Sequence, residues 1–91
     1  MNTETYNLGA ELDSFNSDEV QSGILAILER GCSVLLDMSA CNYISSTGLR
    51  VLLYTKKVAA SKGLKVFLKG VNPEVQDVMT VTGFDTFFDY A

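Results

Sequence analysis

The chain of 91 residues contains no histidine, no tryptophan, a single proline and only two cysteines. Without histidine it has no imidazole for a Ser-His or Cys-His pair, for a metal site, or as a general base. It also has no G-x-x-x-x-G-K-[ST] or G-x-G-x-x-G segment, so no phosphate-cradling loop of either type is predicted. We therefore expect a binding protein rather than an enzyme, with no catalytic residues, metal or cofactor.

The two cysteines, Cys32 and Cys41, are too few for a zinc site and lack the C-x-x-C spacing of a redox motif. A small secreted domain normally carries more cysteines, paired as disulfides, so this usage favours a reducing compartment. The polar N-terminus lacks a signal peptide, and no apolar run approaches the roughly 20 residues that span a bilayer. These features predict a cytoplasmic protein with two reduced thiols and no direct membrane insertion.

Positive charge is scarce, since 11 acidic residues outnumber 7 basic ones and the net charge is −4. An acidic chain repels phosphate backbones and anionic lipid headgroups, so we expect no nucleic-acid partner. An apolar content of 47% with 20% charged residues is typical of a globular protein. The length predicts one domain over residues 1–91.

Strand and helix patterns alternate along the chain. Predicted strands cover 4–12, 33–38, 64–68 and 84–90. Predicted helices cover 18–30, the segment from the turn at 45–48 to 62, and 73–82. Asn16 or Ser17 is expected to cap the first helix, and Asn72 the third. The run 33–38 is continuously apolar, which suggests a strand covered on both faces. The order predicts an α/β fold: a mixed or parallel sheet of about four strands, with helices mainly on one face and the first strand near an edge.

Three adjacent hydroxyls, Ser45, Ser46 and Thr47, precede Gly48 at a predicted strand-to-helix turn. One interpretation is structural: a serine caps the helix and its neighbours fill a polar loop. The other is a phosphate switch, because a helix N-terminus offers free amides and a positive dipole end to a phosphate. The residues alone leave both interpretations open, and in either case Ser46 is expected to be exposed in the first helical turn.

The chain resembles the STAS domain family, which includes bacterial anti-sigma factor antagonists and the tails of sulfate transporters. The resemblance is carried by V-L-L-D-M-S at 34–39, by Y-I-S-S-T-G-L-R-V-L-L at 43–53, by A-E-L-D at 10–13, and by segment 72–84. It implies a STAS-like fold for the whole chain, lacking the family's first strand and last helix.

The resemblance also implies a site and a function. The family's phosphorylated serine falls on Ser46, the acid that lies near it falls on Asp13, and the glycine that lets the backbone turn into the helix falls on Gly48. Members of this kind bind an anti-sigma factor serine kinase when unphosphorylated and are released by phosphorylation, and a PP2C-type phosphatase restores binding. The implied partner-binding residues are Asp13, Ser45, Ser46, Thr47, Gly48 and Arg50.

Two positions depart from the family pattern, since Ser45 replaces the usual aspartate before the phosphoserine and Ala10 replaces a usual glycine. The main alternative is a constitutive STAS subunit of a transporter or scaffold complex, in which Ser46 is only a helix cap. A small-ligand or nucleotide binder that uses the same turn is a further alternative.

Overall fold

Four parallel strands form the main sheet of the computed structural model, which describes residues 2–91. Their order is β1 (Thr3–Asn7), β3 (Ser33–Asp37), β5 (Val66–Lys69) and β6 (Asp89–Tyr90). Each neighbouring pair is parallel. The predicted α/β sheet of about four strands is confirmed, with the first strand on an edge.

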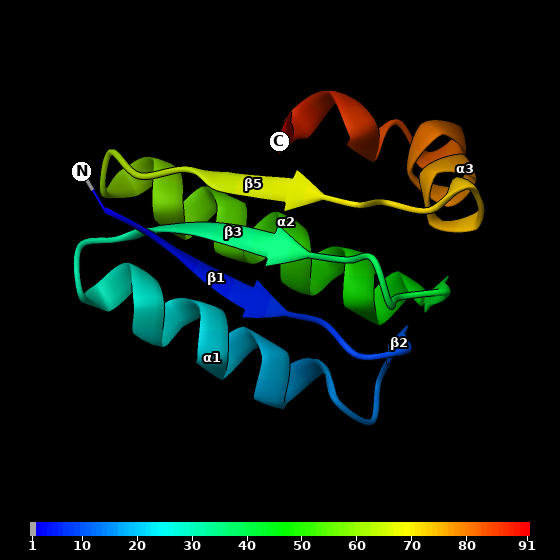
Figure 1. The fold of residues 1–91 in the computed structure, drawn as a ribbon, viewed down its shortest axis with the longest axis horizontal. Coiled ribbons are helices and arrows are strands. Elements are labelled where there is room, and N and C mark those ends of the chain that lie inside the picture. Colours follow the sequence, from blue (N-terminus) through cyan, green and yellow to red (C-terminus); the bar gives the residue numbers. More distant parts are fainter. Residues whose placement is uncertain (1) are drawn as a thin grey trace.

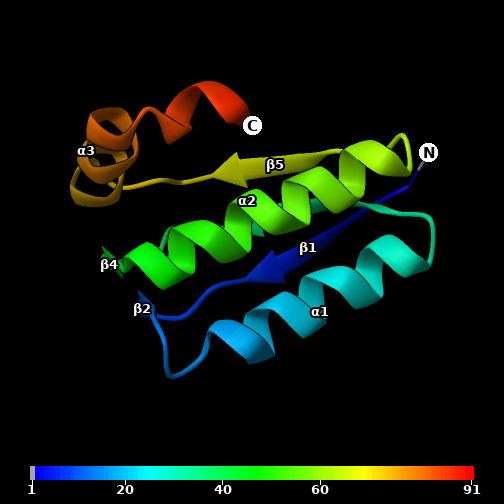
Figure 2. The same cartoon turned by 180° about the vertical axis from the view of Figure 1, so that it is seen from behind.

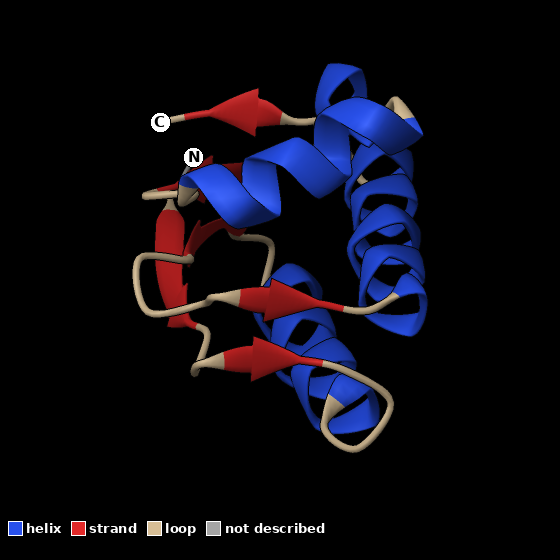
Figure 3. Ribbon diagram, turned by 90° about the vertical axis from the view of Figure 1, so that its right-hand side faces the viewer, coloured by secondary structure: helices blue, strands red, loops and turns tan. Residues whose placement is uncertain are grey.

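The helices α1 (Ser17–Glu29) and α2 (Ser46–Ser61) pack against each other on one face of this sheet (Figures 2 and 3). The third helix, α3 (Pro73–Thr82), lies beyond the ends toward which the strands point (Figure 1). The expectation of helices mainly on one face is therefore confirmed. Within residues 2–91, no helix is both long enough and apolar enough to cross a membrane.

The core lies mainly between the sheet and these two helices, and β2 and α3 also contribute buried side chains. Its largest fully buried apolar side chains are Leu12, Ile24, Leu28, Leu36, Met38, Leu52, Leu68 and Met79. Full burial of a side chain of this size stabilises the fold by about 1.5–3 kcal/mol. On the opposite face of the sheet, Leu35 and its cross-strand partner Phe67 are only half-buried. The expectation that segment 33–38 is covered on both faces is wrong, because helices cover one face only.

The predicted strand over 4–12 is in fact two strands. β1 pairs with β3 as far as Asn7 and Asp37, where β3 ends and the first strand loses its partner. After a break, β2 (Glu11–Leu12) pairs in parallel with β4 (Tyr43–Ile44), in a separate two-stranded sheet. The predicted strand over 84–90 also divides, into the 3₁₀ helix η1 (Phe84–Phe87) and β6.

The helix ends follow the sequence signals with one exception. Asn72 caps α3, its Oδ1 accepting a hydrogen bond from the Val75 amide at 3.0 Å, and Gly83 ends that helix with a left-handed φ of 76°. Asn16 occupies the N-cap position of α1, but its side chain makes no capping bond there. The expectation that the Asn16 side chain caps α1 is wrong. Its side-chain amide group hydrogen-bonds to Asp13 and Glu11 in the preceding segment instead.

Both cysteines are buried and unpaired, as expected. Burial raises the pKa of the Cys41 thiol, because the thiolate would lose solvation in the core. Cys41 is therefore a thiol at neutral pH, and its surroundings are those of a small apolar side chain rather than of a reactive nucleophile.

Candidate functional site

The β2–β4 ladder brings two distant loops together at one end of the molecule. Glu11 pairs with Tyr43, Leu12 pairs with Ile44, and the Ser45 amide donates to the Leu12 carbonyl at 2.9 Å. The end of β2 therefore lies beside β4 and the start of α2 (Figure 2). This arrangement places Asp13 next to the hydroxyl cluster, although the two segments are far apart in the sequence.

The helix cap is Ser45. Its backbone is extended, with φ −88° and ψ 171°, and its Oγ accepts a hydrogen bond from the Gly48 amide at 3.1 Å. Its carbonyl accepts the Leu49 amide at 2.9 Å, which closes the first helical turn. Serine and aspartate are about equally favoured at this position, so Ser45 supplies the cap that an aspartate would supply. The interpretation of Ser46 as the helix cap is wrong.

Ser46 is the first residue of α2 and its side chain is exposed, as expected. Across residues 2–91, no hydrogen bond engages the Ser46 hydroxyl, and the first turn of α2 contains no acidic residue. The hydroxyl is accessible at the positive end of a 16-residue helix. It is thus available for modification without breaking the cap.

Gly48 lies in the first turn of α2 and is buried against β2. A Cβ atom at this position would lie 2.7 Å from the Leu12 carbonyl oxygen and 3.0 Å from Ile44 Cγ1. Its φ is not positive. The expectation that Gly48 lets the backbone turn into the helix is wrong, because the residue is already helical and glycine is needed for close packing. Since Gly48 is buried, it offers a partner little surface.

Asp13 organises the loop between β2 and α1. Its Oδ1 accepts the amides of Phe15 at 2.9 Å and Asn16 at 3.3 Å. In return, Asn16 accepts the Asp13 amide at 2.9 Å and donates to the Glu11 carbonyl at 2.7 Å. The structure therefore places Asp13 near the hydroxyl cluster, with its carboxylate turned to its own loop.

Arg50 and Thr47 complete the first turn of α2. Arg50 is exposed and lies four residues after Ser46, a spacing that puts both side chains on the same face of the helix. No acidic side chain within residues 2–91 pairs with Arg50. Thr47 is half-buried. The exposed members of the predicted set are therefore Ser46 and Arg50, with Thr47 and Ser45 only partly accessible.

Two exposed aromatic residues, one in the Asp13 loop and one on β4, are not among the predicted site residues. The Phe15 side chain is 97% exposed in the Asp13 loop, and Tyr43 on β4 is 54% exposed. Exposed aromatic side chains of this size are typical anchors of protein interfaces. The sequence did contain a signal for Phe15. It is an aromatic residue within the polar, turn-forming stretch 13–17, where neither a helical nor a strand pattern would bury it.

Replacing Ser45 with alanine should lower the free energy of unfolding by about 1 kcal/mol, because the Gly48 amide loses its acceptor. The matched change Ser46→Ala should alter it by less than about 0.5 kcal/mol, since an exposed hydroxyl without a partner is removed. Urea denaturation followed by circular dichroism measures both. Equal effects of the two substitutions would contradict the assignment of the cap to Ser45.

The sequence matches the STAS domain family over residues 2–90. Among characterised proteins, it is 31% identical over 81 residues to BtrV of Bordetella bronchiseptica, named as an anti-sigma factor antagonist. That alignment covers 88% of this chain and 70% of BtrV.

Two solved structures show the same fold at low sequence identity. The anti-sigma factor antagonist SpoIIAA in its unphosphorylated form superposes with a TM-score of 0.76 at 15% identity, over 98% of this chain and 78% of that one. The murine anion transporter Slc26a9 superposes with a TM-score of 0.80 at 17% identity, over 97% of this chain and 16% of the transporter. At these identities the likeness establishes the fold alone.

Proposed function

Because the chain belongs to the STAS domain family, we propose that it is an anti-sigma factor antagonist-like binding module of a partner-switching pathway, with Ser46 as its switch. Unphosphorylated, it binds an anti-sigma factor serine kinase. Phosphorylation of Ser46 by that kinase releases it, and a PP2C-type phosphatase restores the binding form. The relative BtrV, with its name of anti-sigma factor antagonist, supports the general role.

One observation carries the switch: the helix cap and the exposed hydroxyl are different residues. Ser45 caps α2, and the Ser46 hydroxyl is left accessible one position later. A phosphate on Ser46 would add a charge of about −1.5 to −2 at the positive end of the helix, where the domain tolerates it. Modification can then change the surface without costing the fold its cap.

The surroundings of Ser46 suit a protein partner. Phe15 and Tyr43 offer exposed aromatic area, and Arg50 offers an unpaired guanidinium on the same helix face as Ser46. Aromatic and arginine side chains are enriched among residues that dominate interface energies. A partner packed over this surface would have to desolvate a phosphate at its centre. The module therefore acts by binding and release, and we propose no reaction catalysed by the chain itself.

A constitutive subunit of a transporter or scaffold complex is the second candidate function. The fold that this chain shares with part of Slc26a9 favours it, since Slc26a9 is an anion transporter. In this case the exposed Ser46 would carry no phosphate, and the chain would associate permanently with membrane subunits. In this candidate Ser46 was expected to serve as the helix cap. The structure gives that role to Ser45, so the capping argument does not support this candidate.

Mass spectrometry of the protein isolated from its native cells tests the proposal. We expect a phosphate on Ser46 in part of the population and its loss in Ser46→Ala, whereas Thr47→Ala should still be phosphorylated. Affinity purification of the unphosphorylated form should recover a serine kinase. Recovery of membrane transporter subunits, together with an unmodified Ser46, would contradict the switch and support the second candidate.

A further inference from the structure

Arg50 lies four residues after Ser46 on α2, and both side chains are exposed. Residues at this spacing are neighbours on one face of a helix, with about 5–6 Å between their Cβ atoms. The Cα–Cβ bonds of a helix tilt toward its N-terminus, and long side chains follow this direction. The turn that carries Ser46 is therefore within reach of the Arg50 guanidinium.

No carboxylate within residues 2–91 forms an ion pair with this guanidinium. The first turn of α2 contains no acidic residue. In the loop after β2, the Asp13 carboxylate accepts hydrogen bonds from the amides of Phe15 and Asn16 instead. Arg50 is thus free to pair with an anion that is added to its own helix.

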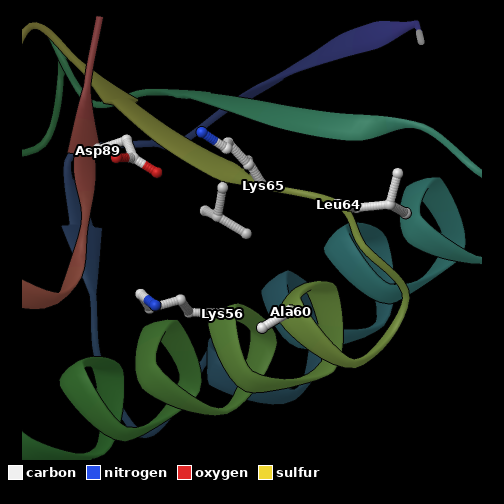
Figure 4. Close-up of a pocket in the computed structure, with 6 residues that line it drawn as sticks. Lys56, Ala60, Leu64, Lys65 and Asp89 are labelled. Atoms are coloured by element: carbon white, nitrogen blue, oxygen red, sulfur yellow. The ribbon is translucent and has the colours of Figure 1, made fainter.

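The other basic side chains are paired or remote from Ser46. They are Arg30, Lys56, Lys57, Lys62, Lys65 and Lys69. Arg30 pairs with Glu4, and Lys69 lies on β5 in the main sheet. Lys56 borders a hollow between α2 and the start of β5 (Figure 4). It is the first lysine along α2, and the ten residues from Ser46 to Lys56 span about 15 Å at the helical rise. Arg50 is therefore the basic residue of α2 that can reach Ser46.

We propose that Arg50 binds the phosphate of phosphorylated Ser46 within the same helix, and that this pairing withdraws the guanidinium from the surface offered to the kinase. The inference rests on the proposed phosphorylation of Ser46. The planar guanidinium fork matches phosphate oxygens and forms charge-assisted hydrogen bonds with them. An anion placed four residues before a cation is also the favourable order on a helix. Phosphorylation thus adds a negative charge and removes an arginine anchor in one step.

Phosphorus NMR of the full chain, with phosphoserine incorporated at position 46 during expression, tests the pair without any kinase. A neighbouring guanidinium favours the phosphate dianion, whose formation otherwise has a pKa of about 6. At about 0.15 M salt, this pKa should be lower in the phosphorylated chain than in its Arg50→Gln variant, by about 0.2–0.7 unit. The Nε–H signal of Arg50 should shift with the same titration.

Two further variants separate the pair from general electrostatics. Lys57→Gln removes an exposed positive charge farther along the same helix and should leave the phosphate pKa unchanged. Arg50→Lys keeps the charge without the guanidinium fork and should retain part of the lowering. Equal phosphate pKa values in the unmodified and Arg50→Gln backgrounds, or equal changes with Arg50→Gln and Lys57→Gln, would overturn the pair.

Calorimetry against the kinase tests whether Arg50 is an anchor before phosphorylation. In the unphosphorylated chain, Arg50→Gln should weaken kinase binding about tenfold, whereas Lys57→Gln should leave the affinity unchanged. Arg50 is exposed, so both variants should fold, as circular dichroism would verify. Unchanged kinase affinity in Arg50→Gln would refute the withdrawal of an anchor.

The pair and the proposed switch can fail separately, because the NMR titration uses an incorporated phosphate. A lowered phosphate pKa that depends on Arg50, together with an unmodified Ser46 in native cells, would support the pair and contradict the proposed function. A phosphate on Ser46 in native cells, with no effect of Arg50 on its pKa, would support the switch and refute the pair.

Discussion

Replacing Gly48 with alanine should lower the free energy of unfolding by about 1–3 kcal/mol. The added methyl group would lie 2.7 Å from the Leu12 carbonyl oxygen, a backbone atom that cannot turn away as a flexible side chain could. The same carbonyl accepts the Ser45 amide, so moving it also strains the β2–β4 ladder. Overpacking of this kind typically costs about 1–3 kcal/mol, and loss of a hydrogen bond adds about 1 kcal/mol. The higher helix propensity of alanine returns about 1 kcal/mol.

Urea denaturation and thermal melting measure this loss. For a domain of this size, we expect the melting temperature to fall by about 4–24 °C. Gly9→Ala is the matched control, because no atom lies within 4 Å of the Cβ it would add and its φ is not positive. It should change the free energy of unfolding by less than about 0.5 kcal/mol. A Gly48→Ala protein as stable as the unmodified chain would show that α2 and β2 are less closely packed than described.

Ser46→Asp should weaken binding to the anti-sigma factor serine kinase by roughly 100-fold or more, while leaving the fold intact. A charge at the centre of a packed interface must be desolvated or must face the partner's own acids, which typically costs several kcal/mol. Each 1.4 kcal/mol corresponds to about a tenfold change in affinity. Within the domain, the carboxylate would lie near free helix amides and the dipole, which stabilises it by about 0.3–1 kcal/mol.

Isothermal titration calorimetry against the kinase measures the affinity, and thermal melting checks the fold. Ser46→Ala should bind like the unmodified chain and resist release in the presence of ATP. Thr47→Ala should bind and still be released, which distinguishes the two neighbouring hydroxyls. If Ser46→Asp binds the kinase as tightly as the unmodified chain does, the phosphate-switch proposal is wrong.

Local sequence signals predicted most of the elements because each signal has a local physical cause. Asn72 before Pro73, and Gly83 after the last apolar residue of α3, fix that helix from both ends. The alternation of strands and helices required parallel pairing, and the structure confirms it. Ser46 was also placed correctly, as an exposed residue in the first turn of α2.

Features that depend on distant contacts could not be read from the sequence. Nothing local in Tyr43–Ile44 predicts a strand, since its pairing depends on where Glu11–Leu12 lies in space. For the same reason, the need for glycine at position 48 comes from Leu12 and not from a local turn. Whether Ser45 or Ser46 is the cap depends on a shift of one residue in the start of α2. Helix propensities do not define a helix boundary to that precision.

The β2–β4 ladder also has a consequence for hydrogen exchange. It contains only two residue pairs and belongs to a different sheet from the core strands. Few hydrogen bonds must break to open it, so its amides should exchange through local opening at far lower free energy than global unfolding. The segments that carry Asp13, Phe15 and Tyr43 are thus joined to each other by a small separable unit, whereas Ser46 itself is held by α2. These segments can therefore adjust their positions on binding while the main sheet remains closed.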